Sequence, residues 1–111
     1  MSVRRALIAA IAALLVGCSS AGTTASSSAL IPVVTTISTF NSLVEGVGGD
    51  RVHVQNLVPV GASAEDYEPT PQDAVTLSQA KILVENGAGL ESWLAATLKN
   101  VTSSDLHVVV G

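Results

Sequence analysis

From Leu30 onward, short runs rich in β-branched residues alternate with stretches in which apolar residues recur every three or four positions. The β-rich runs are residues 31–36, 51–58, 81–85 and 107–110. This alternation is typical of βαβ units, in which a helix returns the chain so that the next strand lies parallel to the previous one. We therefore predict an α/β fold built on a parallel, Rossmann-like sheet with flanking helices.

The stretches between the β-rich runs predict three helices. The first ends at a Gly-Gly pair, residues 48–49, and its apolar positions follow the i, i+3, i+4, i+7 pattern of one helical face. These positions are Phe40, Leu43, Val44 and Val47. The second helix is expected from Pro71 to about Ala80. The third apolar face follows a turn at residues 86–89 and consists of Leu90, Trp93, Leu94 and Leu98.

A long loop, residues 58–71, leads into the second predicted helix and reads as a binding loop. Thr70 can cap that helix, Pro71 suits the first helical position because its missing N–H has no partner there, and Asp73 can complete a capping box. The loop is therefore expected to end on a rigid helix. Its acidic residues are Glu65, Asp66 and Glu68.

The first residues predict export. Arg4 and Arg5 precede an uninterrupted apolar run, residues 6–16, which is shorter than the roughly 20 residues that a membrane-spanning helix needs. The run ends in Leu15-Val16-Gly17-Cys18, so we expect residues 1–17 to be a lipoprotein signal peptide and Cys18 to be lipidated. The alternative for Cys18 is an unmodified, buried thiol.

Residues 18–29 are mostly Ser, Thr, Ala and Gly, and are expected to form a flexible tether between a lipid anchor and a folded domain at residues 30–111. Cys18 is the only cysteine, so that domain relies on packing without an intramolecular disulfide. The sequence stops at a predicted strand end, where a doubly wound sheet would continue with another helix. The chain is therefore expected to be a fragment of a larger α/β protein.

The charge balance indicates which partners are plausible. The chain has 5 basic and 9 acidic residues, and two of the basic ones, Arg4 and Arg5, lie in the predicted signal peptide. The remaining domain is acidic, which argues against nucleic acid or anionic lipid head groups as partners and favours cations. No nucleotide-binding glycine motif, phosphate loop, Gly-x-Ser-x-Gly or Cys/His pair is present, so an enzyme is not expected.

Several motifs in order resemble one family: the metal-binding receptors of ABC importers for manganese, zinc or iron, which are solute-binding lipoproteins that include surface adhesins. The motifs are the lipobox, Val33-Val34-Thr35-Thr36, residues 47–52, residues 57–62, Tyr67-Glu68-Pro69-Thr70-Pro71-Gln72-Asp73 and residues 86–94. The resemblance implies two α/β lobes joined by a long helix, with the metal bound between them and delivered to a membrane permease. Residues 30–111 would be the N-terminal lobe, incomplete, of a monomeric receptor anchored by lipid on the extracytoplasmic face of the cell membrane.

The resemblance also implies a metal ligand. The family usually reads Gly-Ala-Asp-Pro-His before the Tyr-Glu-Pro segment, and that histidine binds metal, whereas residues 61–65 here read Gly-Ala-Ser-Ala-Glu. Glu65 occupies the ligand position, and an oxygen donor favours Mn²⁺ or Fe²⁺ over Zn²⁺. The alternative is that Glu65 is a solvated loop acid in a truncated or non-metal-binding surface lipoprotein, with an adhesive role or no remaining function.

The neighbours of Glu65 are weaker candidates for metal binding. Asp66 is expected to face solvent, and Glu68 to interact with the free N–H groups at the start of the second helix. Tyr67 is expected to pack the loop against the lobe.

Two histidines and two hydroxyl residues complete the candidates. His53 and His107 fall in or at the start of strands, away from the strand carboxyl ends where parallel sheets bind ligands, so we expect both on the surface. Thr36 and Ser38 follow the first strand and are expected to line the cleft without binding metal.

Overall fold

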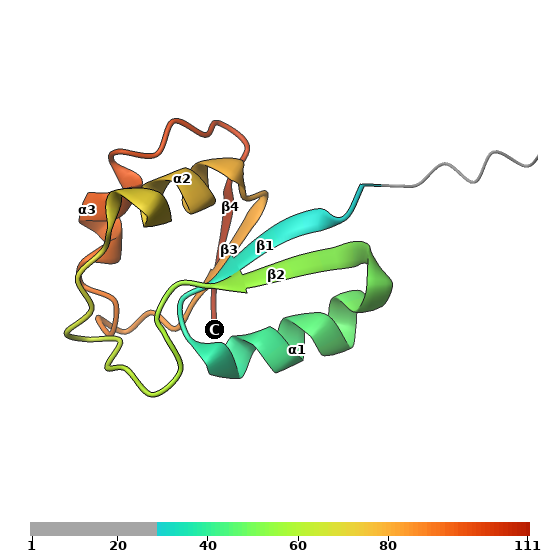
Figure 1. Cartoon of the computed structure of the whole chain (residues 1–111), viewed down its shortest axis with the longest axis horizontal. Coiled ribbons are helices and arrows are strands. Elements are labelled where there is room, and N and C mark those ends of the chain that lie inside the picture. Colours follow the sequence, from blue (N-terminus) through green and yellow to red (C-terminus); the bar gives the residue numbers. More distant parts are fainter. Residues whose placement is uncertain (1–28) are drawn as a thin grey trace, which may run out of the picture.

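The computed structural model describes residues 29–111, and the predicted signal peptide, Cys18 and nearly all of the tether lie outside this part of the chain. All four strands are parallel, in the order β2-β1-β3-β4, which confirms the predicted α/β sheet (Figure 1). The strands are β1 (Ile31–Thr35), β2 (Val52–Asn56), β3 (Ile82–Glu85) and β4 (His107–Val110).

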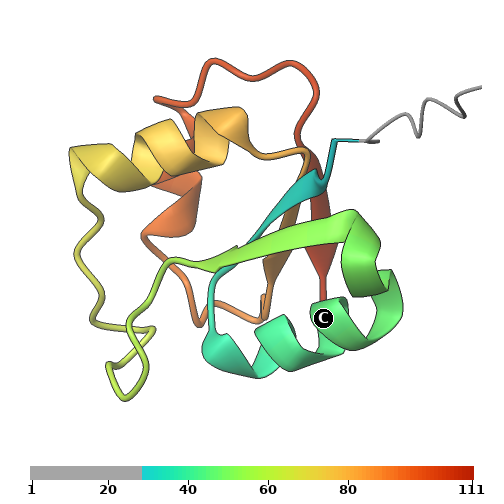
Figure 2. The same ribbon diagram turned by 45° about the vertical axis from the view of Figure 1, so that its right-hand side comes forward.

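Helices cover both faces of the sheet. Helix α1 (Ser38–Gly48) lies on one face and is followed by a 3-10 turn at Gly49–Arg51, whereas α2 (Pro71–Gln79) and α3 (Leu94–Leu98) lie on the other (Figures 1 and 2). This arrangement follows from the strand order, because the chain moves from β1 to β2 in one direction and then from β2, past β1, to β3 and β4 in the other. Since such crossovers are right-handed, the two directions place their helices on opposite faces.

The core lies between the sheet and the α2/α3 layer. Its side chains come from β1, from the segment after β2, from α2, from β3 and from α3. They are Val34, Leu57, Leu77, Ala80, Leu83 and Leu94, and each is almost fully buried. Leu57 and Val58 were expected at the end of the second strand but follow it, and their N–H groups still donate to the carbonyls of Thr35 and Thr36. Leu57 and Val58, the apolar end of the 51–58 run, are therefore buried beyond the end of β2.

The other face is covered less completely than the sequence predicts. No residue of α1 is fully buried, and in its expected apolar face Leu43 is 60% and Val47 87% exposed. Helix α1 packs mainly against β2, so an open apolar hollow of about 430 Å³ remains beside it, lined also by Ile82, Val84 and Val109.

The third helix is also shorter than predicted, because it begins at Leu94 rather than near Leu90. The turn with positive φ at Gly87, Ala88 and Gly89 continues through Trp93, and the N–H groups of Leu90 and Leu94 donate to carbonyls three residues back, as in turns rather than in an α-helix. Within residues 29–111, no helix is long and apolar enough to cross a membrane.

Candidate functional site

The loop that carries Glu65 crosses the carboxyl edge of the sheet. The chain leaves β2 at Asn56, passes the ends of the strands and enters α2 at Pro71 (Figure 2). Along this path the side chain of Ala64 points inward and is 9% exposed, whereas Glu65 and Asp66 are exposed. The exposure of Asp66 confirms the prediction, and Glu65 is presented outward at the edge where parallel α/β sheets bind ligands.

Two aromatic residues hold this loop against the lobe. The indole Nε1–H of Trp93 donates to the carbonyl oxygen of Ala64 at 2.7 Å. The ring of Tyr67 meets the ring of Trp93 edge to face, with centroids 5.1 Å apart and an interplanar angle of 61°. Tyr67 therefore packs the loop against the lobe, as predicted.

The end of the loop is fixed by the capping box that the sequence predicts. The Asp73 N–H donates to Thr70 Oγ1 at 3.3 Å, and Asp73 Oδ2 accepts from the Thr70 N–H at 2.6 Å. The same Oδ2 accepts from the Tyr67 hydroxyl at 2.9 Å. Partial burial, and secondarily the bond to Asp73, raises the pKa of Tyr67 above its ordinary value. The hydroxyl therefore remains a donor throughout the physiological pH range.

This cap corrects the expectation for Glu68. Glu68 is exposed, and within the described part of the chain its side chain makes no hydrogen bond to the start of α2. Asp73 fills that role because a residue in the first helical turn can reach back to the N-cap, which an extended residue before the cap cannot do as readily.

A buried carboxylate lies where the strand order changes direction, between the ends of β1 and β3. Glu91 is 5% exposed. Its Oε1 accepts from Thr36 Oγ1 at 2.5 Å and from the Asn86 N–H at 2.9 Å, and its Oε2 accepts from the Gly87 N–H at 3.2 Å. Thr36 is fully buried by this contact, so the expectation that it lines the cleft is wrong. Glu91 instead closes the crevice between the two strand ends.

The basic side chains of the lobe lie away from the carboxyl edge of the sheet, and Asp50 and Asp105 lie near them, with Lys81 paired to Asp105 at 3.1 Å. Among residues 29–111 the basic side chains are Arg51, Lys81 and Lys99, which directly precede β2, directly precede β3 and follow α3 on the way back to β4. The carboxyl edge carries only acids, on the 65–68 loop and at the end of β3. Burial, and secondarily the neighbouring Glu91, raises the pKa of Glu85. This edge is thus suited to cations.

Both histidines lie on the surface, as predicted. His53 is exposed on β2 and His107 is exposed at the start of β4. Ser38, expected to line the cleft, is half-buried and begins α1. No group of three His, Cys, Asp or Glu side chains that could hold a metal ion occurs within residues 29–111. Glu65 is thus the one predicted metal ligand that this part of the chain presents, and a complete coordination shell needs further donors.

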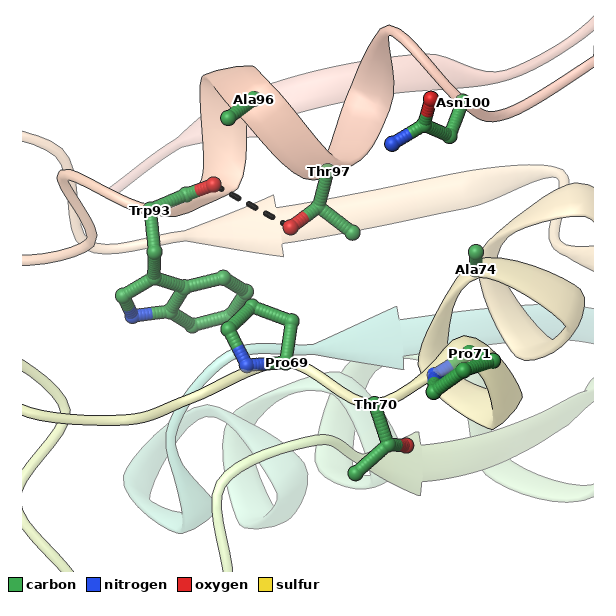
Figure 3. A pocket seen from close by; sticks show the side chains of 8 residues that line it. All are labelled: Pro69, Thr70, Pro71, Ala74, Trp93, Ala96, Thr97 and Asn100. Carbon is green, nitrogen blue, oxygen red and sulfur yellow. Dashed lines mark hydrogen bonds between the residues drawn. The ribbon is translucent and has the colours of Figure 1, made fainter.

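An open hollow of about 570 Å³ lies behind the loop, between the start of α2 and the length of α3 (Figure 3). Pro69, Pro71 and Trp93 form its apolar wall, and Thr97 donates to the carbonyl of Trp93 at 3.1 Å (Figure 3). None of its lining residues is His, Cys, Asp or Glu.

Sequence comparison identifies the family. The family described as "Zinc-uptake complex component A periplasmic" matches residues 33–111. The chain belongs to this family. The match begins within β1 and includes the other three strands, the 65–68 loop and Trp93.

Individual members of the family are similar over most of the chain. The manganese-binding lipoprotein MntA of Halalkalibacterium halodurans is 35% identical over 104 residues, which are 93% of this chain and 34% of that protein. The iron ABC transporter substrate-binding lipoprotein MtsA of Streptococcus pyogenes is 35% identical over 91 residues, 78% of this chain and 29% of that protein. The chain thus spans about a third of the length of these relatives.

Solved structures share the fold. The crystal structure of ZnuA superimposes with a TM-score of 0.66 at 30% identity, covering 72% of this chain and 31% of that one. The similarity extends over the described sheet and its helices, which confirms the α/β lobe predicted from the resemblance.

Proposed function

We propose that residues 30–111 form the N-terminal lobe of an extracytoplasmic receptor that captures a divalent metal ion, Mn²⁺, Zn²⁺ or Fe²⁺, as cargo for an ABC importer. The observation that carries this proposal is the presentation of Glu65, an exposed carboxylate on a braced loop at the acidic carboxyl edge of the sheet. Relatives named as manganese-binding and iron-transporter lipoproteins support it. The proposed role is binding and delivery rather than catalysis.

Glu65 would bind the metal through a carboxylate oxygen. Oxygen ligands suit Mn²⁺ and Fe²⁺, whereas Zn²⁺ prefers nitrogen and sulfur, so the lobe favours the harder cations. Because the described residues offer no second and third ligand beside Glu65, the remaining donors belong to a second lobe that closes over this edge. The lobe by itself then binds metal only weakly.

The beginning of the chain supplies the location. We propose that residues 1–17 direct export, that Cys18 carries the lipid anchor, and that residues 18–29 let a monomeric receptor reach the permease from the outer face of the cell membrane. An anchor of several acyl chains holds the protein firmly without a spanning helix, because each buried CH₂ contributes about 0.8 kcal/mol.

Calorimetric titration of the chain with Mn²⁺ tests the ligand assignment. We expect weak binding that Glu65→Gln abolishes and that Asp66→Asn retains. Asp66→Asn is the matched control because it removes the same charge from the adjacent exposed position. An equal loss of Mn²⁺ affinity in the two variants would mean that the overall negative charge of the loop attracts the ion, without a specific ligand. Unchanged binding in Glu65→Gln would instead mean that the ion binds elsewhere and that Glu65 is a solvated loop acid.

Glu65→His tests the selectivity. An imidazole at this position replaces an oxygen donor with a nitrogen donor, so the preference should move from Mn²⁺ toward Zn²⁺. Titration of both variants with both ions gives the ratio of the two affinities. A ratio that does not change would remove residue 65 from the coordination shell.

A further inference from the structure

The bond between Trp93 and the loop is made at the residue directly before the proposed ligand. Trp93 Nε1–H donates to the carbonyl oxygen of Ala64 at 2.7 Å, and the side chain of Ala64 is buried. We propose that Trp93 is a positioning residue that sets the direction in which Glu65 presents its carboxylate. This inference rests on the proposed function of Glu65.

The peptide bond transmits the constraint from Trp93 to Glu65. The carbonyl oxygen of Ala64 and the amide nitrogen of Glu65 belong to one planar peptide unit, so holding that oxygen orients the plane through which Glu65 is attached. The buried Ala64 methyl group fixes the other side of the same unit. Together these contacts fix the N–Cα bond of Glu65, so the direction of its side chain can change only by rotation about that bond and within the side chain itself.

Trp93 is itself tied to the sheet. It lies two residues after Glu91, whose carboxylate binds Thr36 at the end of β1 and the turn after β3. The backbone carbonyl of Trp93 accepts from both the N–H and the hydroxyl of Thr97, each at 3.1 Å. The position of the Glu65 loop is therefore set relative to the two central strands, although the loop itself follows the edge strand β2.

Tyr67 provides a comparison, because it also braces the loop but at a different point. Its ring packs on Trp93 and its hydroxyl binds Asp73, beyond Glu65 and toward α2. Tyr67→Phe removes one hydrogen bond and keeps the ring contact. It therefore loosens the α2 side of the loop without releasing the Ala64 carbonyl.

The test removes the indole N–H and changes nothing else. Trp93 is the only tryptophan in the chain, so growth with the isosteric analogue β-(3-benzothienyl)alanine replaces the N–H with sulfur at this position alone. Two quantities are measured on the labelled chain by NMR. The first is amide hydrogen exchange at Ala62 and Asp66, whose N–H groups donate to the Pro59 carbonyl and the Ser63 hydroxyl. The second is the Mn²⁺ concentration that broadens signals around residue 65.

We expect exchange at the Ala62 and Asp66 amides to accelerate by about fivefold to tenfold, because the loop that holds their hydrogen bonds opens more often once it loses the bond to Trp93. Mn²⁺ should then bind at least about threefold more weakly, with exchange of the β1 and β3 amides unchanged, and Tyr67→Phe should leave Mn²⁺ binding within about twofold of the parent. An analogue-containing chain with unchanged exchange or unchanged Mn²⁺ binding would overturn the positioning role.

The Glu65→Gln chain separates this inference from the proposed function. If Mn²⁺ broadening persists in Glu65→Gln, the ligand assignment fails and the positioning of a ligand fails with it. If broadening depends on Glu65 but not on the indole N–H, the ligand assignment stands and only the role of Trp93 is refuted.

Discussion

The carboxylate of Glu91 joins the ends of β1 and β3, and its replacement by the isosteric amide measures how strongly it does so. In Glu91→Gln, the amide oxygen can keep the two bonds made by Oε1, from Thr36 and Asn86. The amide nitrogen then faces the Gly87 N–H, so that two donors oppose each other where Oε2 accepted a bond of 3.2 Å. One charge-assisted bond is lost and one partly buried donor loses its partner.

The expected magnitude follows from these losses. A hydrogen bond to a charged group contributes about 1.5 to 3 kcal/mol, and an unsatisfied buried donor costs about 1 to 3 kcal/mol. The two energies describe the loss of the same bond, so they are not added together. We therefore expect Glu91→Gln to lower the free energy of unfolding by about 2 to 3 kcal/mol. For a lobe of this size, such a loss lowers the Tm by about 10 to 20 °C.

Urea and thermal unfolding followed by circular dichroism measure this loss. Glu68→Gln is the matched control, since it makes the same chemical change at an exposed loop position and should alter stability by no more than about 0.5 kcal/mol. If Glu91→Gln were as stable as Glu68→Gln, the carboxylate would not hold the strand ends together, and the argument for the rigidity of the turn before Trp93 would be refuted.

Two further predictions concern stability. Thr70→Ala removes the side-chain cap of α2 and should cost about 1 kcal/mol in urea denaturation, whereas an equal stability would mean that Asp73 alone secures the helix start. Glu85→Gln should stabilise the lobe at neutral pH, because burial and Glu91 raise the pKa of Glu85 in the folded state and its ionised form is therefore unfavourable there. The stability that Glu85 contributes is present below its unfolded pKa and is lost as the pH rises through its folded pKa, so the advantage of the variant should disappear below about pH 4; a gain that persists in acid would point to packing instead.

The features that the sequence predicted well are local. The cap of α2 depends on residues three positions apart, and the alternation of exposed His53 and half-buried Val54 in β2 follows from the two faces of a strand. The parallel sheet could be predicted because the β-rich runs were separated by helical segments long enough for crossover connections. These patterns are visible in a single window of sequence.

The hydrogen bonds that hold the site together could not be predicted from a single window of sequence. Thr36 and Glu91 are 55 positions apart, and Ala64 and Trp93 are 29 positions apart, so no periodicity links them. The one available signal for Glu91 was a carboxylate shortly after the Asn86-Gly87 turn, where free backbone N–H groups need acceptors. The exposure of Leu43 and Val47 on α1 was likewise not predictable, because the apolar period indicates a face but not what covers it.

Metal coordination by Glu65 is tested most directly by anomalous diffraction at the manganese edge, from crystals of the chain soaked at a high Mn²⁺ concentration to offset its weak affinity. We predict an anomalous peak within bonding distance of a Glu65 carboxylate oxygen, at the carboxyl edge of the sheet, and no such peak in Glu65→Gln crystals. A manganese peak that lies elsewhere on the lobe, with Glu65 free of metal, would contradict the assignment.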